Sequence, residues 1–198
     1  YFKDFSSGKA GNVLTYIMEV NGMDFISAVK ELAKYKGIEV EYESEEFAKK
    51  HKERMEKITS LRPILNASLK KYRELLMDLE RDHPAWNELE KRKYDKDLII
   101  DWQIGCAPGS KFIYNNCVEA GVKELAKEVG LISDTNDKYW NRLIYPIHDE
   151  NDQLVGLAGR DLSGKKEMAK WINPVDSTLY NKDQILFGLN KAKKEIAK

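Results

Sequence analysis

The sequence is poor in the residues that bind metals or form disulfides. It contains two cysteines, Cys106 and Cys117, and its three histidines are isolated from one another. Two cysteines are too few for a disulfide framework, and each lies among apolar residues, so we expect inert, buried thiols. Because no Cys-x-x-Cys or His-x-x-x-His spacing occurs, the sequence argues against a zinc site within this chain.

The sequence also lacks long apolar runs and an excess of charge of one sign. No run approaches the ~18 apolar residues that a membrane-spanning helix needs, and no signal peptide is recognisable. We therefore expect a cytoplasmic protein with no membrane partner. Lysine plus arginine equals aspartate plus glutamate at 33 each, which excludes a protein whose whole surface binds nucleic acid. Residues 159–198 nevertheless hold nine basic against five acidic residues, a local excess compatible with salt-sensitive phosphate binding.

Familiar catalytic motifs are missing as well. The segments 8–11 and 163–166 join glycine to lysine, but neither has the spacing of a P-loop, so we interpret both as turns, with weak anion binding at the first as the alternative. No serine lies in a Gly-x-Ser-x-Gly elbow. The pairs Asp95/Asp97 and Asp149/Asp152 resemble Mg²⁺ ligands, yet their positions favour a helix start and a hairpin turn.

Apolar spacing predicts a helical first half. We expect a strand over 1–5, a helix over 13–20, a second helix capped by Asp24 and ended by Gly37, and a charged linker over 41–60 that leads into a long helix with Pro63 in its first turn. The second helix is expected to bury Phe25, Ala28, Val29, Leu32 and Tyr35. The long helix is expected to bury Leu65, Leu69, Tyr72, Leu76 and Leu79.

From Tyr139 onward the period changes from helix to strand. Shorter helices are predicted near 84–92, 96–103, 111–119 and 122–129, with a buried strand at 104–108 between them. Residues 143–148 and 154–158 predict a hairpin, residues 169–172 a third strand, and the C-terminal residues a helix with Ala192 and Ile196 on one face. The fold class is therefore α+β, a helical half followed by a small, mainly antiparallel sheet with flanking helices.

Single cations and aromatics recur where these strands end or loops begin. Arg142 begins one strand and Arg160 ends another, Lys170 precedes Trp171, and Tyr180 and Lys182 repeat that pairing in a loop. A charge beside a stacking surface is typical of proteins that bind single-stranded nucleic acid. From the residues alone, each is equally a solvated charge or a core aromatic, and Trp171 in particular fits a core position.

Taken in order, these motifs resemble the bacterial-type replicative DNA primases of the DnaG type. Residues 142–147 (RLIYPI) with 156–160 (GLAGR) are similar to the family's Arg-x-x-Phe-Pro-Ile and Gly-Phe-Gly-Gly-Arg, residues 170–173 (KWIN) to its Lys-Tyr-Leu-Asn, and residues 186–189 (LFGL) to its Leu-Tyr-Gly-Leu. Residues 1–40 look like the end of its zinc-binding domain. The resemblance runs through the whole chain.

The resemblance implies a division of the chain and a function. Residues 1–40 would be a remnant of the zinc-binding domain, and residues 41–198 the DNA-guiding N-terminal subdomain of the catalytic core. The chain starts at Tyr1, and we expect it to be a piece of a longer enzyme. The parent would make RNA primers on single-stranded DNA from ribonucleoside triphosphates, with a replicative helicase as partner. Its Mg²⁺ or Mn²⁺ would be held by a Toprim part that this piece lacks, so the piece itself, expected as a monomer, would be inactive.

By the same resemblance, five residues occupy the basic and aromatic positions that line the family's single-strand groove: Arg142, Arg160, Lys170, Trp171 and Lys182. Three departures from the family pattern stand out. Asp4 and Ser7 lie where the family has cysteines, which argues against a thiolate zinc site. Asp101 lies where the family often has a basic residue, and Trp171 replaces a tyrosine, which keeps the stacking face but loses the hydroxyl.

Two other hypotheses fit the same sequence. One is a non-catalytic, primase-like module of a phage or mobile element that binds DNA or a replisome protein. The other is a protein-interaction scaffold whose basic residues are merely solvated. The scaffold predicts unchanged DNA affinity when Arg160 and Lys182 are replaced by alanine, whereas the primase hypothesis predicts a loss.

Overall fold

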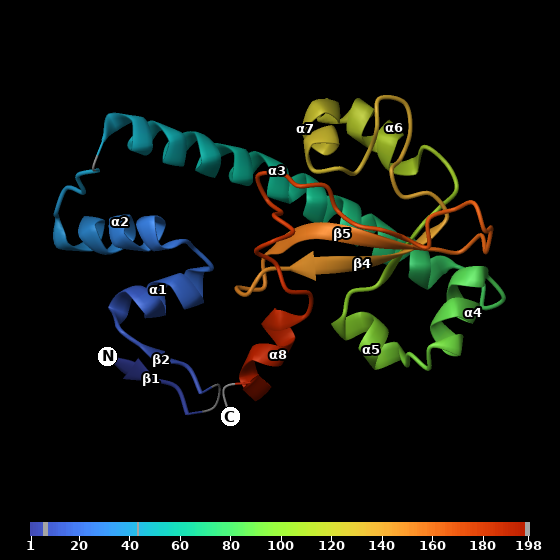
Figure 1. The fold of residues 1–198 in the computed structure, drawn as a ribbon, viewed down its shortest axis with the longest axis horizontal. Helices are drawn as coiled ribbons and strands as arrows, with labels where there is room; N and C mark the ends of the chain where they lie inside the picture. Colours follow the sequence, from blue (N-terminus) through green and yellow to red (C-terminus); the bar gives the residue numbers. More distant parts are fainter. Residues whose placement is uncertain (6–7, 43, 197–198) are drawn as a thin grey trace. The chain divides into compact units, whose positions relative to one another are not determined.

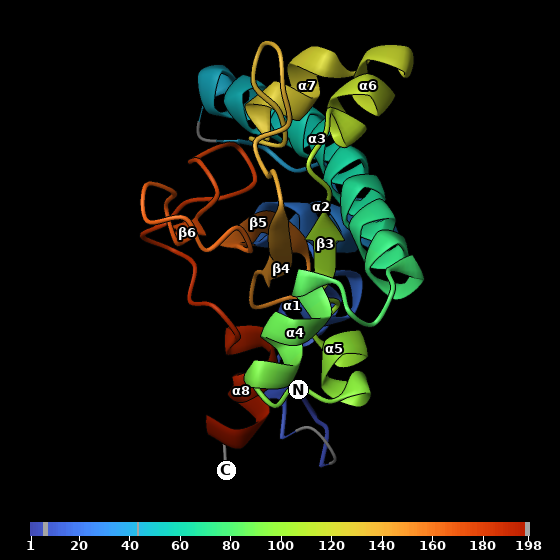
Figure 2. The ribbon, with the colours of Figure 1, turned by 90° about the vertical axis from the view of Figure 1, so that its right-hand side faces the viewer.

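The chain divides into two compact units. The computed structural model describes residues 1–5, 8–42 and 44–196, drawn in Figures 1 and 2. The first unit comprises Tyr1–Arg54, His148–Gln153 and Leu186–Lys198, and the second unit comprises Met55–Ile147 and Leu154–Ile185. The helix α3 (Glu45–Asp78) contributes residues to both. The expected division of the chain between residues 40 and 41 stays a prediction.

The first unit begins with a small antiparallel ribbon and two short helices. Its elements are β1 (Phe2–Lys3), β2 (Ala10–Gly11), α1 (Val13–Asn21), α2 (Phe25–Lys36), the start of α3 (Glu45–Asp78) and α8 (Leu189–Ile196). Asn12 caps α1 by accepting a hydrogen bond from the backbone N–H of Thr15, and Asp24 caps α2 from that of Ser27. Side-chain caps of this kind satisfy N–H groups that the helix leaves unpaired. The predicted bounds of both helices are confirmed.

The expected burial along α2 is wrong at its two aromatic positions. Phe25 is 57% exposed and Tyr35 is 82% exposed, whereas Ala28 and Ala33 are buried. The small alanines lie where the helix packs closely, so the large rings at either end stay outside. Helical spacing identified the correct face of α2, but it did not distinguish the buried residues at the centre of that face from the exposed residues at its ends.

Polar contacts join α8 and the hairpin turn to the rest of the first unit. The Asn190 amide donates a 2.6 Å hydrogen bond to Oδ1 of Asp152 in the turn. The Glu19 carboxylate in α1 pairs with Lys9 and lies 3.7 Å from Nζ of Lys193 in α8. These contacts explain why segments far apart in sequence form one compact unit.

The helix α3 begins much earlier than expected. The sequence predicted a linker over 41–60 and a helix start at Pro63, but α3 runs from Glu45 to Asp78 with Pro63 inside it. Ser44 accepts a hydrogen bond from the backbone N–H of Phe47 at its start. Lys50 and Glu46 form an (i, i+4) ion pair of the kind that supports an exposed helix. The prediction was wrong because charged residues suit a solvated helix as well as a linker.

The second unit is built on a four-stranded antiparallel sheet. Its strand order is β3-β4-β5-β6 (Figure 2), with the bounds Gly105–Ala107, Arg142–His148, Leu154–Asp161 and Trp171–Ile172. In the register of β3 and β4, Gly105 faces Ile144. In that of β5 and β6, Arg160 faces Trp171. The predicted strands, the hairpin and the α+β class are confirmed.

Helices cover this sheet and bury both of its faces. They are the second half of α3, α4 (Pro84–Lys91), α5 (Lys96–Asp101), α6 (Phe112–Glu119) and α7 (Lys123–Glu128). Ala107, Ile144 and Leu157 belong to a core cluster with α3, α6 and α7. The neighbouring strand positions Cys106, Leu143 and Ala158 belong to a second cluster with α4 and α5. Burial on both faces explains why these strands are almost continuously apolar in sequence.

Both cysteines are buried, as predicted. Burial raises the pKa of the Cys106 thiol to about 12, and burial together with the charge of Asp137 raises the pKa of Cys117. At pH 8 only about one Cys106 in ten thousand is then the reactive thiolate. We expect no rapid reaction of the native protein with a disulfide reagent at pH 8, and reaction of both thiols in urea. Rapid stoichiometric labelling without urea would contradict this burial.

Candidate nucleic-acid interface

Arg160 and Trp171 lie opposite each other on the edge pair of the sheet. The guanidinium carbon of Arg160 is 5.7 Å from the centroid of the Trp171 ring. The Tyr145 ring of β4 is tilted against the same indole at a centroid distance of 5.2 Å. Trp171 is nevertheless 41% exposed, so it is not a core residue. It offers a stacking surface that a cation and an aromatic ring hold in place.

Lys170 adds a free positive charge beside this ring. It is exposed, and its backbone carbonyl accepts a hydrogen bond from Asp161 at the end of β5. In the parts of the chain that the structure describes, its ammonium group makes no ion pair. A fixed backbone with an unpaired charge suits contact with a phosphate group.

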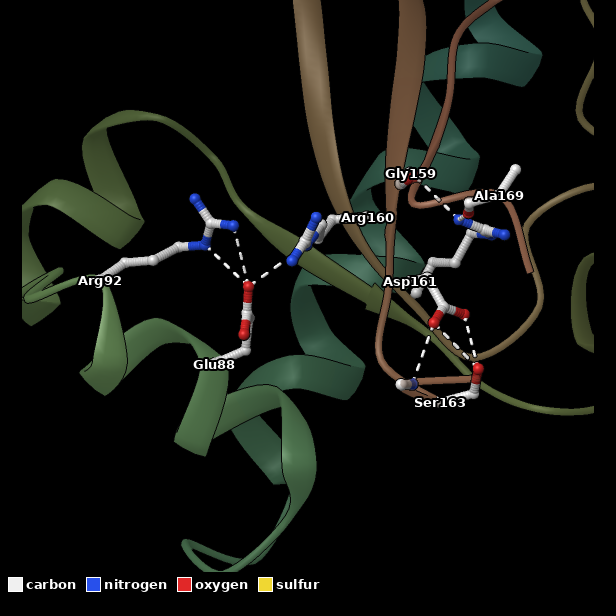
Figure 3. A network of polar contacts seen from close by, with 9 residues as sticks. Glu88, Arg92, Gly159, Arg160, Asp161, Ser163 and Ala169 are labelled. Carbon is white, nitrogen blue, oxygen red and sulfur yellow. Dashed lines mark hydrogen bonds and ion pairs between the residues drawn. The ribbon is translucent and has the colours of Figure 1, made fainter. Parts of the chain in front are cut away.

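Arg160 is held by a carboxylate from a distant helix. Its Nε lies 3.2 Å from Oε1 of Glu88 in α4, and the same oxygen accepts from Nη2 of Arg92 at 2.9 Å. Figure 3 shows Glu88 between the two guanidinium groups. All three side chains are mostly enclosed, with exposed fractions of 15% for Arg160, 17% for Glu88 and 29% for Arg92. The cluster carries a net charge of plus one.

The electrostatics keep Glu88 ionised. Burial acts to raise the pKa of its carboxyl group, but the hydrogen bonds and charges of Arg92 and Arg160 outweigh burial and lower that pKa below its usual value. Glu88 therefore remains a full negative charge next to Arg160 at neutral pH.

Arg142, in contrast, is an interior side chain. It is 1% exposed, and its Nη1 donates to the carbonyl of Gly159 at 3.2 Å and to that of Ala169 at 2.9 Å. Figure 3 shows both carbonyls beside the loop that Asp161 and Ser163 begin. Arg142 is therefore buried in this structure, and its expected direct contact with DNA stays a prediction. Arg142 anchors the end of the loop that carries Lys170 and Trp171.

Lys182 lies in the loop that follows the sheet. Its backbone N–H donates to Oδ1 of Asp176 at 3.0 Å, and its side chain is exposed. Among the described residues, no ion pair or hydrogen bond joins it to Arg160, Lys170 or Trp171. Its aromatic neighbour, Tyr180, is only 8% exposed and belongs to the core, so of the two interpretations left open for this ring the structure supports the core aromatic.

Sequence reasoning missed two residues of this region. Glu88 and Tyr145 contact the predicted residues directly, but nothing in the sequence connects them with Arg160 or Trp171.

The two carboxylate pairs have the structural roles that we expected. Asp95 caps α5 by accepting a hydrogen bond from the backbone N–H of Leu98 at 2.7 Å. Asp149 accepts from the backbone N–H groups of Asn151 and Gln153, both at 2.9 Å, and thereby closes the hairpin turn. Within residues 1–5, 8–42 and 44–196, no three His, Cys, Asp or Glu side chains gather in a group that could hold a metal ion. Ser7, expected at a family cysteine position, lies outside the described residues.

Two family profiles match the chain. The profile described as the DNA primase catalytic core, N-terminal domain, matches residues 72–193, and the CHC2 zinc finger of the DnaG zinc ribbon matches residues 1–48. The first match covers more than half of the chain, so the fold and the sequence define a catalytic-core segment. The chain belongs to the DnaG-type bacterial DNA primases. The zinc-finger match weighs against our expectation about zinc, although residues 1–48 contain no cysteine.

Several proteins of similar sequence are DNA primases. That of Lactococcus lactis is 30% identical over all of this chain and 31% of its own length. That of Listeria monocytogenes is 28% identical over all of this chain and 33% of its own length. The chain thus spans about a third of these relatives.

Solved primase structures share the fold. The Aquifex aeolicus primase, with its zinc-binding and RNA polymerase domains, matches at 25% identity with a TM-score of 0.63, over 98% of this chain and 46% of that one. The RNA polymerase domain of Mycobacterium tuberculosis DnaG was solved in complex with a double-stranded DNA oligomer that has a 6-nucleotide overhang. It matches at 26% identity with a TM-score of 0.62, over 70% of this chain and 45% of that one.

Of the helices described in the present chain, none has the length and apolar character needed to cross a bilayer.

Proposed function

We propose that this chain is the template-holding part of a DNA primase, an enzyme that synthesises short RNA primers on single-stranded DNA. Its membership of the DnaG-type family supports this function. So does its sequence similarity to a DNA primase, which extends over the whole of this chain. The M. tuberculosis domain with the same fold was solved with DNA bound. We therefore assign to this chain the guiding of template DNA and of incoming nucleotides.

One observation carries the assignment of the site. A half-exposed indole, Trp171, lies against the guanidinium of Arg160 and directly follows the unpaired Lys170. A ring of this kind stacks on a base of any sequence, while the adjacent cations attract the phosphates. We propose direct DNA contacts from Arg160, Lys170, Trp171 and Lys182, and a positioning role for Arg142.

We assign the chemical step to other parts of the enzyme. Phosphodiester formation needs divalent metal ions to neutralise the charge that develops on the phosphate groups. By family resemblance, Mg²⁺ or Mn²⁺ would be held by a Toprim segment, and ribonucleoside triphosphates and a replicative helicase would be the parent's other partners. We also propose that residues 1–40 are zinc-domain-derived, that residues 41–198 belong to the catalytic core, and that this chain is a monomer.

The test is the binding of a fluorescently labelled single-stranded oligonucleotide, measured by anisotropy at several salt concentrations. We expect Arg160→Ala and Lys182→Ala each to weaken binding by about 1 kcal/mol or more and to make the salt dependence shallower by about one phosphate contact. Lys91→Ala is the control, because Lys91 is an exposed lysine of α4 in the same unit. Wild-type affinity in both test variants would instead favour the scaffold hypothesis.

A further inference from the structure

The carboxylate of Glu88 is shared unequally between its two arginines. Its Oε1 accepts from Nε and Nη2 of Arg92, both at 2.9 Å. Arg160 reaches the same oxygen with Nε alone, at 3.2 Å. Glu88 and Arg92 are also four residues apart on α4, which places them on one helix face. The pair on α4 is thus the tighter one, and Arg160 is the weaker partner.

Arg160 is itself incompletely satisfied in this arrangement. Its Nη1 is buried and, within the described parts of the chain, makes no hydrogen bond. A buried donor without an acceptor costs free energy, so a guanidinium in this state gains by meeting a new acceptor. Glu88 loses little when Arg160 leaves, because two donors from Arg92 remain.

We propose that Glu88 is a built-in competitor for Arg160, a carboxylate that holds the guanidinium group which a DNA phosphate would otherwise bind. This inference rests on the proposed function, because it requires Arg160 to contact DNA. A phosphodiester oxygen is the acceptor that Arg160 lacks, and exposed Trp171 and Lys170 lie beside it to receive the same strand. Exchange of one charged acceptor for another keeps Arg160 paired in both states.

By competing for Arg160, Glu88 lowers the affinity of this surface for DNA, which suits a surface that guides a template. An uncompensated arginine would hold each phosphate strongly, whereas a nearby carboxylate offers Arg160 an alternative partner each time a phosphate departs. A negative side chain placed near the binding site of a negatively charged phosphate is a known means of tuning binding. Glu88 therefore favours the release and movement of the strand over its tightest retention.

The experiment compares two variants that remove the same charge from the same helix. Glu88→Gln and Glu90→Gln each remove one negative charge from α4, but Glu90 is exposed and is not in the cluster with Arg160. By anisotropy with the labelled single-stranded oligonucleotide at low salt, we expect E88Q to bind about three- to tenfold more tightly than wild type. E90Q should stay within about twofold. Combined with Arg160→Ala, E88Q should lose its advantage.

Three outcomes would overturn the proposal while leaving the DNA-binding function intact. They are weaker binding by E88Q, a gain that E90Q matches, and a gain that persists without Arg160. If the wild type fails to bind the oligonucleotide, the proposed function itself fails. Tryptophan fluorescence reports whether each variant is folded. Should E88Q unfold, Glu88→Asp keeps the charge but withdraws it by one methylene, and tighter binding than wild type is again the expected result, with equal or weaker binding against it.

Discussion

Replacement of Gly105 by alanine is expected to lower the free energy of unfolding of the second unit by about 3 kcal/mol. Gly105 lies in β3, close to the backbone of α3. An added Cβ atom would lie 2.8 Å from both the carbonyl carbon and the Cβ atom of Tyr72, and 3.0 Å from the backbone nitrogen of Arg73. Tyr72 is fully buried, so the clash is relieved only by separation of the helix from the sheet.

Urea unfolding followed by tryptophan fluorescence measures this loss selectively. All four tryptophans, Trp86, Trp102, Trp140 and Trp171, belong to the second unit, so the signal reports on its core. The control is Gly109→Ala, where the atoms nearest to the added Cβ belong to the half-exposed indole of Trp140. A side chain at the surface can move aside, and we expect a loss of about 0.5 kcal/mol or less. Equal losses at both positions would show that the contact between α3 and β3 is looser than described.

The sequence correctly predicted helices and strands wherever they bury a periodic apolar face. The buried residues of α3 begin at Leu61 and continue to Leu76, and this is the part of the helix that apolar spacing identified. Residues 45–60 bury no side chain completely. Their only half-buried residues recur at helical spacing: Ala48, His51, Met55 and Ile58. The wrong prediction of a linker there reflects how weak this apolar stripe is, since a largely solvated helix is specified by capping and ion pairs more than by packing.

The site could be predicted only in part, for a related reason. Arg160, Lys170 and Trp171 flank strands that are close in sequence, so their proximity follows from the hairpin and its neighbouring strand. Glu88 is 72 residues away from Arg160, and nothing in the sequence reveals which helix packs near the end of β5. A charged residue at a strand start can point inward or outward, and Arg142 was assigned to the single-strand groove by family resemblance, which does not reveal the direction of its side chain.

Replacement of the buried Arg142 by methionine is expected to lower the free energy of unfolding of the second unit by about 3 kcal/mol. Methionine fills a similar volume but cannot donate the hydrogen bonds to Gly159 and Ala169. The loop that ends at Ala169 then loses its anchor, and Lys170 and Trp171 lose their fixed positions. Urea unfolding by tryptophan fluorescence measures the loss, and anisotropy at low temperature measures the weaker binding of single-stranded DNA by the protein that remains folded.

The salt dependence of DNA binding distinguishes a residue that positions the site from one that contacts a phosphate. Each lysine or arginine that neutralises a phosphate adds about one released counterion to the slope. Lys170→Met is the matched control, because Lys170 is exposed and unpaired in the described structure. It should change stability by about 0.5 kcal/mol or less and make the slope shallower by about one. R142M should lower affinity while keeping the wild-type slope, since a buried guanidinium neutralises no phosphate. If R142M instead reduces the slope with little loss of stability, Arg142 binds DNA directly, and its carbonyl contacts are exchanged for phosphate contacts in the complex.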